Sequence, residues 1–452
     1  MATLQELLSD VDAARDEIVE LTQALVRIPT VNTGVMPTGN ETPAAELLSE
    51  RLTAEGIPTE IIESAPGRGN LVARWEGEGD GPSLMFMGHL DVVPAEDEEQ
   101  WIHPPFAAEV ADGRIWGRGA ADMKATVAAE AIALIVLKRR GVVPSGDLRL
   151  VAAADEEAGG AYGVGWLATN RPDTLQADLA INEGGGQPIR HEGRVTYPIA
   201  TGEKGRLEVE ITVTGRGYHA SAPWMADNAI YGARPVLDRI CAYRPEVSVD
   251  ALMFRHLGAA LGLDDPISPQ ALERLIADIE TRDPLLASWL KAASRMTIAA
   301  TMIRAGVKSN SIAETCRITC DVRTLPWQDD AYVARELDKM LDGLDNVRYE
   351  ITTTAEPSAS PYQTPFIERL MSATRTALDR PDISFMPGLA TGFTDSRLVR
   401  PLGVLAYGFT PVHPDSDPNY AGAHNVNESI AIEDVLVMTR TFVALAWELL
   451  GQ

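Results

Sequence analysis

Short apolar runs that end in a histidine or in acidic residues constrain the fold of this 452-residue chain more than any other feature. The run at 83–88 leads into His89, the run at 148–154 leads into three consecutive acids, and the run at 179–181 is followed closely by Glu183. Apolar runs without alternation are typical of strands buried on both faces of a parallel or mixed sheet. Open α/β sheets build their sites beyond the carboxyl ends of such strands, so these polar residues are expected to meet at one edge.

The pattern of the rest of the chain divides this α/β unit into two parts. Residues 1–199 alternate helical and strand-like segments, and α/β character returns after a stretch rich in Pro and Ser at 356–361. Between them, residues 200–356 follow the order β-α-β-β-α-β of a ferredoxin-like fold, with a mostly helical insertion at 251–293. We therefore expect a mixed-sheet α/β domain of residues 1–199 and 357–452, interrupted by a smaller α+β domain.

Within the smaller domain, the segment Arg206–Thr214 alternates strictly between apolar and polar residues, which is typical of a strand with one wet face. The remaining periodicities predict helices at 228–241 and 329–341, and strands at 296–303, 312–322 and 347–353.

Composition excludes several classes of partner. The chain has 39 Lys and Arg against 65 Asp and Glu, a net charge of −26, so most of its surface repels nucleic acid and anionic membranes. No apolar run reaches the roughly 18 residues of a membrane span, and the first 30 residues do not resemble a signal peptide. Three cysteines are too few for a disulfide scaffold and fit a reducing compartment, so we expect a cytoplasmic protein. Cys316 and Cys320 share one face of a predicted strand and are expected in its core.

His89 and Asp91 form an H-x-D pair at the end of a predicted buried strand. On an extended chain the two side chains face the same way, so the Asp91 carboxylate can accept the spare ring N–H of His89. Such a carboxylate fixes the tautomer of a metal-bound imidazole, although the pair alone leaves a purely structural role open.

Other acidic residues are ambiguous when taken one by one. Asp122 opens a predicted helix and can be a simple N-cap. It also stands where the last glycine of a G-x-G-x-x-G motif counted from Gly117 would be, so the glycines before it do not form a dinucleotide-binding loop. Three adjacent carboxylates at 155–157 require an offsetting cation unless they form a solvated loop. His424 follows a further apolar run at 403–408. Histidine and carboxylate ligands without nearby Cys suit Zn, Co or Mn.

Together, the motifs GHLDVVP, GRGAADMKA, DEEAGG and NEGGG and the late His424 resemble the dinuclear-zinc amidohydrolases. This family includes aminoacylase, acetylornithine deacetylase, succinyl-diaminopimelate desuccinylase, carboxypeptidase S-like proteins and related dipeptidases. The resemblance covers essentially the whole chain. It implies that the α/β domain is a zinc-peptidase catalytic domain, that the inserted domain is a lid, and that two divalent ions are bound, either zinc or, alternatively, cobalt or manganese.

The resemblance also implies a role for each matching residue of the catalytic domain. Asp122 would bridge the two ions and be followed by a cis peptide bond. The remaining ligands would be His89 and Glu183 at one ion, and Glu157 and His424 at the other. Glu156 would be the general base that takes a proton from the metal-activated water and returns it to the leaving amine, and Asp91 would orient His89.

Substrate-contacting residues are implied in the same way. His219 in the lid would stabilise the tetrahedral oxyanion, in many relatives from the partner subunit. Asn310 and Arg323 would bind substrate, with Arg323 pairing to a carboxylate. Gly392 and Thr394 lie in a loop that resembles one contacting the substrate backbone, or have a structural role. The other four histidines, His103, His191, His256 and His413, are expected to have no ligand role.

These implied roles predict a metal-dependent hydrolase that cleaves the amide bond of N-acyl-L-amino acids or related small substrates with a free carboxylate. Glu183 as the fifth ligand favours a deacylase, and a metallo-dipeptidase or carboxypeptidase is the alternative. A binding or assembly protein with a decayed site is a third hypothesis, which the complete ligand set disfavours.

Asn425 replaces the Gly that relatives have after the late His. A homodimer through the lid is also implied, with Arg206–Thr214 as a candidate edge strand.

Overall fold

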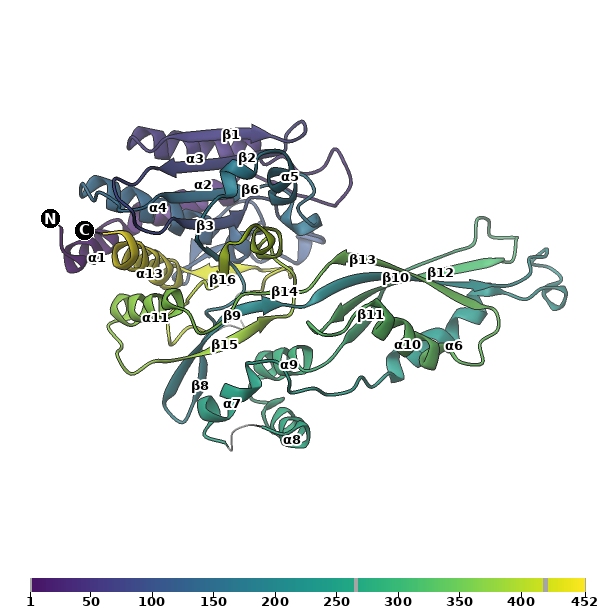
Figure 1. Cartoon of the computed structure of the whole chain (residues 1–452). Coiled ribbons are helices and arrows are strands. Elements are labelled where there is room, and N and C mark those ends of the chain that lie inside the picture. The colour runs from purple at the N-terminus through teal and green to yellow at the C-terminus, as the bar shows by residue number, and fades with distance from the viewer. Residues whose placement is uncertain (1, 264–266, 418–421, 452) are drawn as a thin grey trace.

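The apolar runs form the central strands of a ten-stranded mixed sheet (Figure 1). Strand β3 (Leu84–His89) is parallel to both β6 (Leu148–Ala153) and β7 (Leu179–Asn182), and β7 is parallel to β16 (Leu405–Gly408). Every residue of β3, β6 and β7 is buried, as the continuous apolar runs predict. The carboxyl ends of these four strands therefore lie at one edge of the sheet.

The computed structural model describes residues 2–263, 267–417 and 422–451. Residues 264–266 of the expected helical insertion and residue 421, which begins the AGAHNVNES motif, lie outside this described part.

The order of the large sheet is β1-β2-β6-β3-β7-β16-β9-β14, and β8 and β15 also pair with β9. The bounds of its other strands are β1 (Thr59–Glu63), β2 (Gly69–Trp75), β8 (Ile189–His191), β9 (Arg194–Glu203), β14 (Ser358–Ala359) and β15 (Ser384–Ala390). A small separate sheet has the order β17-β5-β4 and consists of β4 (Glu109–Ala111), β5 (Arg114–Trp116) and β17 (Ser429–Ala431).

Helices cover both faces of the large sheet, which explains why its central strands do not alternate. The main apolar cluster joins one face to six helices: α1 (Leu4–Ala13), α2 (Arg15–Val26), α3 (Thr42–Ala54), α4 (Ala125–Arg139), α11 (Pro365–Leu378) and α13 (Ile432–Leu450). A second cluster joins the other face to α5 (Val164–Asn170) and α12 (Ser396–Val399). Among the helices of the described residues, none combines the length and the apolar character that crossing a membrane requires.

A four-stranded sheet with two helices projects from this body as a long arm, here called the lid (Figure 1). Its elements follow the predicted β-α-β-β-α-β order: β10 (Gly205–Thr214), α6 (Ala229–Ala242), β11 (Thr297–Ala305), β12 (Thr315–Thr324), α10 (Asp330–Leu341) and β13 (Val347–Ala355). The spatial order of the strands is β11-β12-β10-β13. Cys316 and Cys320 are both buried in its apolar core, as predicted.

The expectation that Arg206–Thr214 lies at a sheet edge is wrong. This segment forms β10, which pairs with β12 on one side and with β13 on the other, so the edges are β11 and β13. Strict alternation reports only that one face of a strand is wet, and every strand of a sheet covered on one face has that property.

The helical insertion packs against the large sheet rather than against the lid sheet. It consists of α7 (Phe254–Leu261), α8 (Pro269–Ile279) and α9 (Pro284–Ala293). Its apolar cluster includes Ile189 of β8 and Met386 and Leu389 of β15. Figure 1 shows α7, α8 and α9 beside these strands, next to the junction between the body and the lid.

Helix α4 carries a carboxyl group in its apolar interior. The side chain of Glu130 is fully buried, and neither carboxyl oxygen has a hydrogen-bond partner among the described residues. Burial raises the pKa of Glu130 well above its ordinary value of 4.5. The folded protein therefore keeps a proton that the unfolded chain releases as the pH rises through that value.

We predict that Glu130 makes the free energy of unfolding fall as the pH rises above about 4.5, because the unfolded state then binds fewer protons than the folded state. The contribution amounts to ~1.4 kcal/mol per pH unit over the interval between the two pKa values. Urea unfolding of the Glu130→Gln variant over a pH series should lack this contribution, whereas Glu50→Gln, at an exposed position of α3, should retain it. Identical pH dependences for the Glu130→Gln variant and the parent protein would contradict the account.

Candidate metal centre

Five potential ligands, drawn from segments far apart in the sequence, meet beyond the carboxyl ends of β3, β6 and β7. His89 is the last residue of β3, and Glu183 directly follows β7. Glu157 lies in the turn after β6, Asp122 lies just before α4, and His424 lies in the loop before β17. This is the edge at which open α/β sheets place their sites.

The five residues form two sets of donor atoms. His89 Nε2 lies 3.0 Å from Asp122 Oδ1 and 3.9 Å from Glu183 Oε1. His424 Nε2 lies 3.3 Å from Asp122 Oδ2 and 3.2 Å from Glu157 Oε2. Within each set, one donor atom of every residue lies within 4.8 Å of the others. Asp122 belongs to both sets and turns a different oxygen to each, as a bridging carboxylate would.

The backbone around Asp122 differs from the helix start that the sequence suggested. Helix α4 begins only at Ala125, with Lys124 as its N-cap, and Asp122 has an extended conformation with φ −127° and ψ 94°. The expected cis peptide bond between Asp122 and Met123 is confirmed. The sequence pattern could not distinguish an N-cap from a residue just outside the helix, because both positions favour Asp.

Glu428 holds the backbone of Asp122 in place. Its carboxylate accepts hydrogen bonds from the N–H groups of Ala121 and Asp122, at 2.8 and 3.1 Å, and pairs with the buried Arg118. Glu428 follows His424 by four residues, so one loop supplies both a potential ligand and the support for the bridging carboxylate.

Asp91 has a broader role than orienting a histidine. The Nδ1 atom of His89 lies 3.0 Å from the backbone carbonyl of Asp91 and 3.5 Å from its carboxylate, so the expected carboxylate–imidazole contact is secondary. The carboxylate instead accepts the N–H groups of Glu156 and Glu157, at 3.0 and 3.2 Å, and the side-chain amide of Asn32 at 2.8 Å. Asp91 thereby fixes the turn that carries the two glutamates.

The three adjacent carboxylates are kept apart by the backbone. Asp155 has a positive φ of 69° and turns its side chain away from the site, where it lies 3.3 Å from the buried Arg68. Arg68 also pairs with the buried Glu41 at 2.7 Å. The sequence required an offsetting cation for these acids, and Arg68 is that cation for Asp155, whereas Glu156 and Glu157 face the donor sets.

Glu156 is a buried carboxyl group beside the two donor sets. Its side chain is 6% exposed, and its Oε1 atom has no hydrogen-bond partner among the described residues. Burial and the negative charge of Glu183 raise the pKa of Glu156 well above its ordinary value. Hydrogen bonds to Asp122 and Glu157 likewise raise the pKa of His424 to about 10. The N and O donors of the two sets suit divalent ions such as zinc.

A cavity of about 410 Å³ lies over the donor atoms and is closed by residues of the lid and of one loop. Four of the five candidate ligands line it, all except His89, and its other lining residues include Glu156, Arg206, Arg323, Gly392, Phe393 and Thr394. The structure thus brings Arg323, Gly392 and Thr394 to the same cavity as the potential metal ligands. Arg206 and Phe393 were not identified from the sequence.

Two arginines on neighbouring lid strands share one aspartate. Arg206 of β10 and Arg323 of β12 are cross-strand partners, an arrangement of like charges that is unfavourable unless an anion offsets it. Asp321 accepts from Arg206 Nε at 2.9 Å and from Arg323 Nε at 2.7 Å, which leaves one positive charge in excess. Both guanidinium groups also lie over the ring of Phe393, at 5.6 and 5.5 Å from its centroid.

The loop that contains Gly392 and Thr394 has a buried anchor, which the sequence did not reveal. Glu203 of β9 accepts hydrogen bonds from the backbone N–H and the hydroxyl of Thr394, at 2.6 and 2.9 Å. Its other oxygen pairs with Arg400 at 2.6 Å. Glu203 therefore fixes the position of Thr394, whose loop lines the cavity.

His219 and Asn310 do not line this cavity. Both are exposed and lie close together at the free end of the lid, where Ala220 N donates to Asn310 O at 3.0 Å. The segments that carry them connect β10 to α6 and β11 to β12, and both reach the end of the arm that points away from the body (Figure 1). Within one chain, neither residue reaches the cavity over the donor atoms.

The other four histidines belong to neither donor set. His103, which the sequence gave no acidic partner, lies 2.7 Å from Glu109 Oε2 and packs against Trp116. This pair is outside the cavity, so His103 has no place among the candidate ligands.

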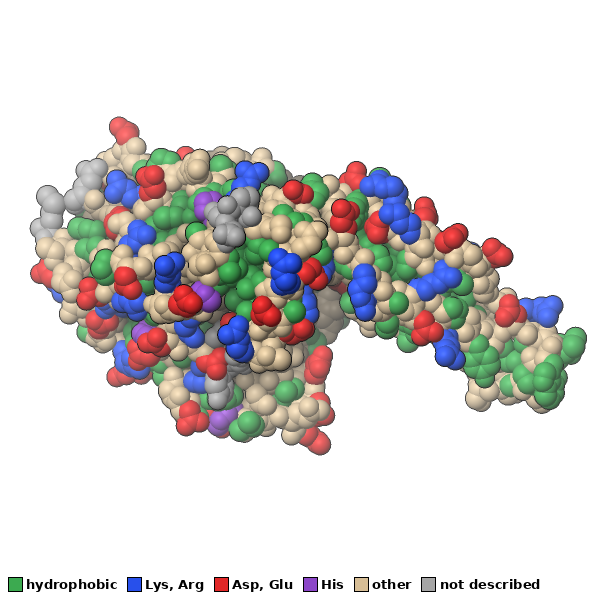
Figure 2. Space-filling model, turned by 90° about the horizontal axis from the view of Figure 1, so that it is seen from below, with side chains coloured by type: hydrophobic (Ala, Val, Ile, Leu, Met, Phe, Trp, Pro, Cys, Tyr) green, Lys and Arg blue, Asp and Glu red, His purple; other side chains and the backbone are tan. Residues whose placement is uncertain are grey.

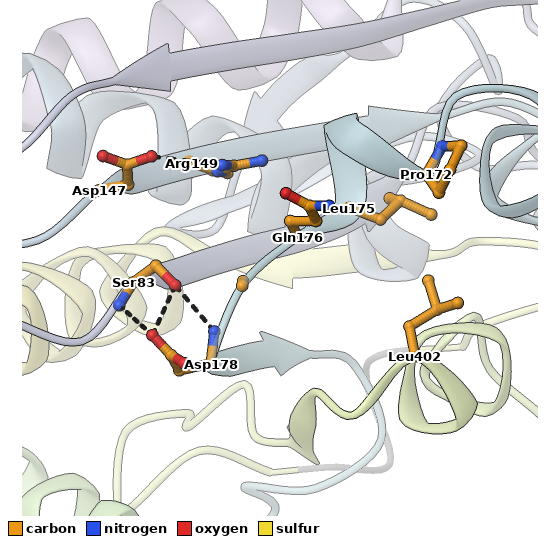
Figure 3. Close-up of a pocket in the computed structure, with 9 residues that line it drawn as sticks. Ser83, Asp147, Arg149, Pro172, Leu175, Gln176, Asp178 and Leu402 are labelled. Atoms are coloured by element: carbon orange, nitrogen blue, oxygen red, sulfur yellow. Dashed lines mark hydrogen bonds and ion pairs between the residues drawn. The ribbon is translucent and has the colours of Figure 1, made fainter.

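A second hollow, of about 420 Å³, lies at the opposite, amino-terminal ends of β3, β6 and β7 (Figure 3). Its polar groups are engaged with one another: Ser83 donates to Asp178 from both its N–H and its hydroxyl at 2.8 Å, and Arg149 lies 3.3 Å from Asp147. These contacts tie strand ends together, and this is not the edge at which α/β sheets build sites.

Comparison with known proteins agrees with this geometry. The model of the family described as "Peptidase family M20/M25/M40" matches residues 85–448. A protein named "Probable succinyl-diaminopimelate desuccinylase" from Staphylococcus aureus (strain MRSA252) is 27% identical over 382 residues, which cover 84% of this chain and 85% of that protein.

Solved structures share the whole fold at low sequence identity. An M20 family metallo-carboxypeptidase, Sso-CP2 from Sulfolobus solfataricus, aligns with a TM-score of 0.71 and 20% identity, over 95% of this chain and 99% of that one. Human carnosine dipeptidase 1 aligns with a TM-score of 0.71 and 15% identity, over 99% of both chains. These likenesses establish that this chain shares the fold of those proteins over nearly its whole length.

Proposed function

The chain belongs to peptidase family M20/M25/M40 and is a metal-dependent hydrolase of amide bonds, and on this premise we propose that it hydrolyses N-acyl-L-amino acids with a free carboxylate. One observation supports this choice of substrate above the others. The cavity over the donor sets contains two arginines that share a single aspartate, which leaves a positive charge facing the site.

We propose that two divalent ions, zinc in the native protein, are held by the two donor sets. His89, Asp122 and Glu183 would bind one ion, and Asp122, Glu157 and His424 the other. The donor chemistry fits, because neutral imidazoles and carboxylates are the usual N and O ligands of zinc. When bound, such a pair lowers the pKa of a shared water and polarises the amide carbonyl.

Glu156 would act as the general base. It lies in the turn fixed by Asp91 and lines the cavity. Its Oε1 atom has no partner within the described part of the chain, so that oxygen is available to a water molecule. Glu156 would accept the proton of the attacking water and deliver it to the nitrogen of the departing amine.

Arg206 and Arg323 would bind the substrate carboxylate together. Arg323 already uses Nε and Nη2 for Asp321, so it cannot offer that edge to a ligand, and Arg206 supplies the second cation. A carboxylate here completes the charge balance of two arginines and one aspartate. Dipeptides also have a free carboxylate, so a metallo-dipeptidase or carboxypeptidase remains the second candidate, and substrate assays separate the two.

We predict that Arg323→Ala and Arg206→Ala each lower kcat/KM for N-acetyl-L-methionine by roughly 10- to 100-fold, because each removes a hydrogen-bonded charge from the carboxylate. Hydrolysis of N-acetyl-L-methioninamide, which has no carboxylate, should stay within about threefold of the parent. Arg317→Ala, at an exposed position on the same strand, serves as the matched control and should affect neither substrate. Equal losses on both substrates would contradict the proposed carboxylate contact.

We also propose that the protein is a homodimer formed through the lid. The edge strand β11 is exposed along most of its length, with Ile303 55% exposed and Val307 in the next turn 97% exposed. Trp224 and Met225 are also exposed, at 88% and 57%, and Figure 2 shows hydrophobic side chains gathered at the free end of the lid. A second copy paired there would satisfy the open strand edge and bring His219 toward the partner's site.

Subunit mixing tests this dimer, because a two-fold arrangement places Glu156 of one chain and His219 of the other in the same site. Glu156→Gln and His219→Ala should each be nearly inactive. Mixing equal amounts after dissociation should restore about a quarter of the parent activity, since half of the dimers then contain one intact site. Introducing Ile303→Glu into both should abolish the recovery, whereas Val143→Glu, on the body, should not. Absence of recovery in dimeric mixtures would contradict the shared site.

A further inference from the structure

A second cavity adjoins the metal centre on another side. It has a volume of about 450 Å³ and shares four lining residues with the cavity that contains the arginines: Asp122, Glu183, Gly184 and Trp289. Two of these are candidate metal ligands, so the reacting amide would sit where the two cavities meet. A substrate placed there can extend one end into each cavity.

The lining of the second cavity is mostly apolar. Its walls include Ile189, Pro198, Ala200 and Leu389 of the large sheet, and Leu285 and Leu286 at the start of α9. No Lys, Arg or His occurs among the described residues that line it. Asp283 lies at its margin, where its carboxylate accepts the N–H of Leu286 and caps α9. The nearby Arg114 lines a separate hollow and donates to Ser429.

The glycine run after β7 makes room for this cavity. A Cβ atom at Gly185 would lie 2.5 Å from the carbonyl oxygen of Gly408, and Gly186 has a φ of +92° with Thr410 equally close. Only glycine allows the backbone to pass here, so the NEGGG motif forms a smooth wall of main chain beside Glu183.

The opposite wall, α9, is held at both ends and in the middle. Asp283 caps its first turn, and the buried Lys204 donates to the carbonyls of Ala292 and Arg295 at its end, both at 2.8 Å. The indole N–H of Trp289 donates to Leu389 O of β15 at 3.0 Å. The cavity is thus formed before any ligand enters, which lowers the entropic cost of binding.

We propose that this second cavity, between α9 and the glycine run, binds the acyl group of the substrate, and that this group is neutral, apolar and several carbons long. The inference rests on the proposed function and names its acyl specificity. The carboxylate end would lie at Arg206 and Arg323, and the acyl chain would point toward Leu286.

The same cavity disfavours an acidic acyl group such as succinyl, the group named for the Staphylococcus aureus relative. A terminal carboxylate would enter a space with no lining cation among the described residues, and Asp283 would be a like charge beside it. Burying an unpaired charge in apolar surroundings is unfavourable, and like charges add to that cost.

The test measures kcat/KM of the zinc-loaded protein on N-acetyl-, N-butanoyl-, N-hexanoyl-, N-octanoyl- and N-succinyl-L-methionine. We expect an increase of about fourfold per added methylene until the cavity is filled. N-succinyl-L-methionine should be roughly 100-fold poorer than the N-hexanoyl compound, because its second carboxylate has no partner. Calorimetry of the Glu156→Gln variant with N-hexanoyl-L-methionine should show a negative heat-capacity change from apolar burial.

A single positive charge introduced into the second cavity should shift the acyl preference from hexanoyl toward succinyl. Leu286→Lys places a cation in the cavity and should raise the succinyl-to-hexanoyl ratio of kcat/KM at least 10-fold, whereas Ser288→Lys, on the exposed face of α9, should leave the ratio unchanged. A flat acyl series, or N-succinyl as the best substrate, would overturn this inference and leave the proposed function standing. Hydrolysis of L-methionyl dipeptides with none of the N-acyl compounds would instead overturn the proposed function and this inference together.

Discussion

The main physical constraint on this structure is the repulsion between several carboxylates that meet at one edge of a buried sheet. The rest of the fold has to hold them there in spite of that repulsion. Asp122, Glu156, Glu157 and Glu183 converge there in a chain that already has a net charge of −26. The buried arginines nearby pair with other acids: Arg68 pairs with Asp155, and Arg118 pairs with Glu428. Neither ion pair lines the cavity over the donor sets. Asp91 does not line it either, and its carboxylate accepts the N–H groups of Glu156 and Glu157. The surrounding fold therefore holds the acids in position for cations that come from outside the chain.

Sequence reasoning located the strands and the converging residues because both follow from local patterns. Continuous apolar runs indicated strands buried on both faces, and the carboxyl ends of parallel strands meet at one edge, which brought His89, Glu157 and Glu183 together. It failed where the answer depends on pairing between distant segments. The edge position assigned to Arg206–Thr214 was wrong because alternation does not specify neighbours. Arg206 was missed for the same reason, since only the register of β10 against β12 places it beside Arg323. The support given by Glu203 and Glu428 likewise depends on contacts that no local pattern encodes.

Two cavities with different chemistry adjoin one set of candidate ligands, and the proposed substrate orientation rests on this asymmetry. The lid contributes the arginines, and the helical insertion contributes an apolar wall, although the two are neighbours in the sequence. The insertion packs on the large sheet, while the lid sheet has its own separate apolar core. His219 and Asn310, at the far end of the lid, fit the proposed use of a second subunit better than any role within one chain.

Anomalous diffraction from crystals grown with zinc tests the central claim most directly, with data collected on both sides of the zinc absorption edge. The account predicts two peaks that share Asp122, one with ligand atoms of His89 and Glu183 and the other with ligand atoms of Glu157 and His424, at about 2.0–2.2 Å. A single peak, or peaks that do not involve Asp122, would contradict it.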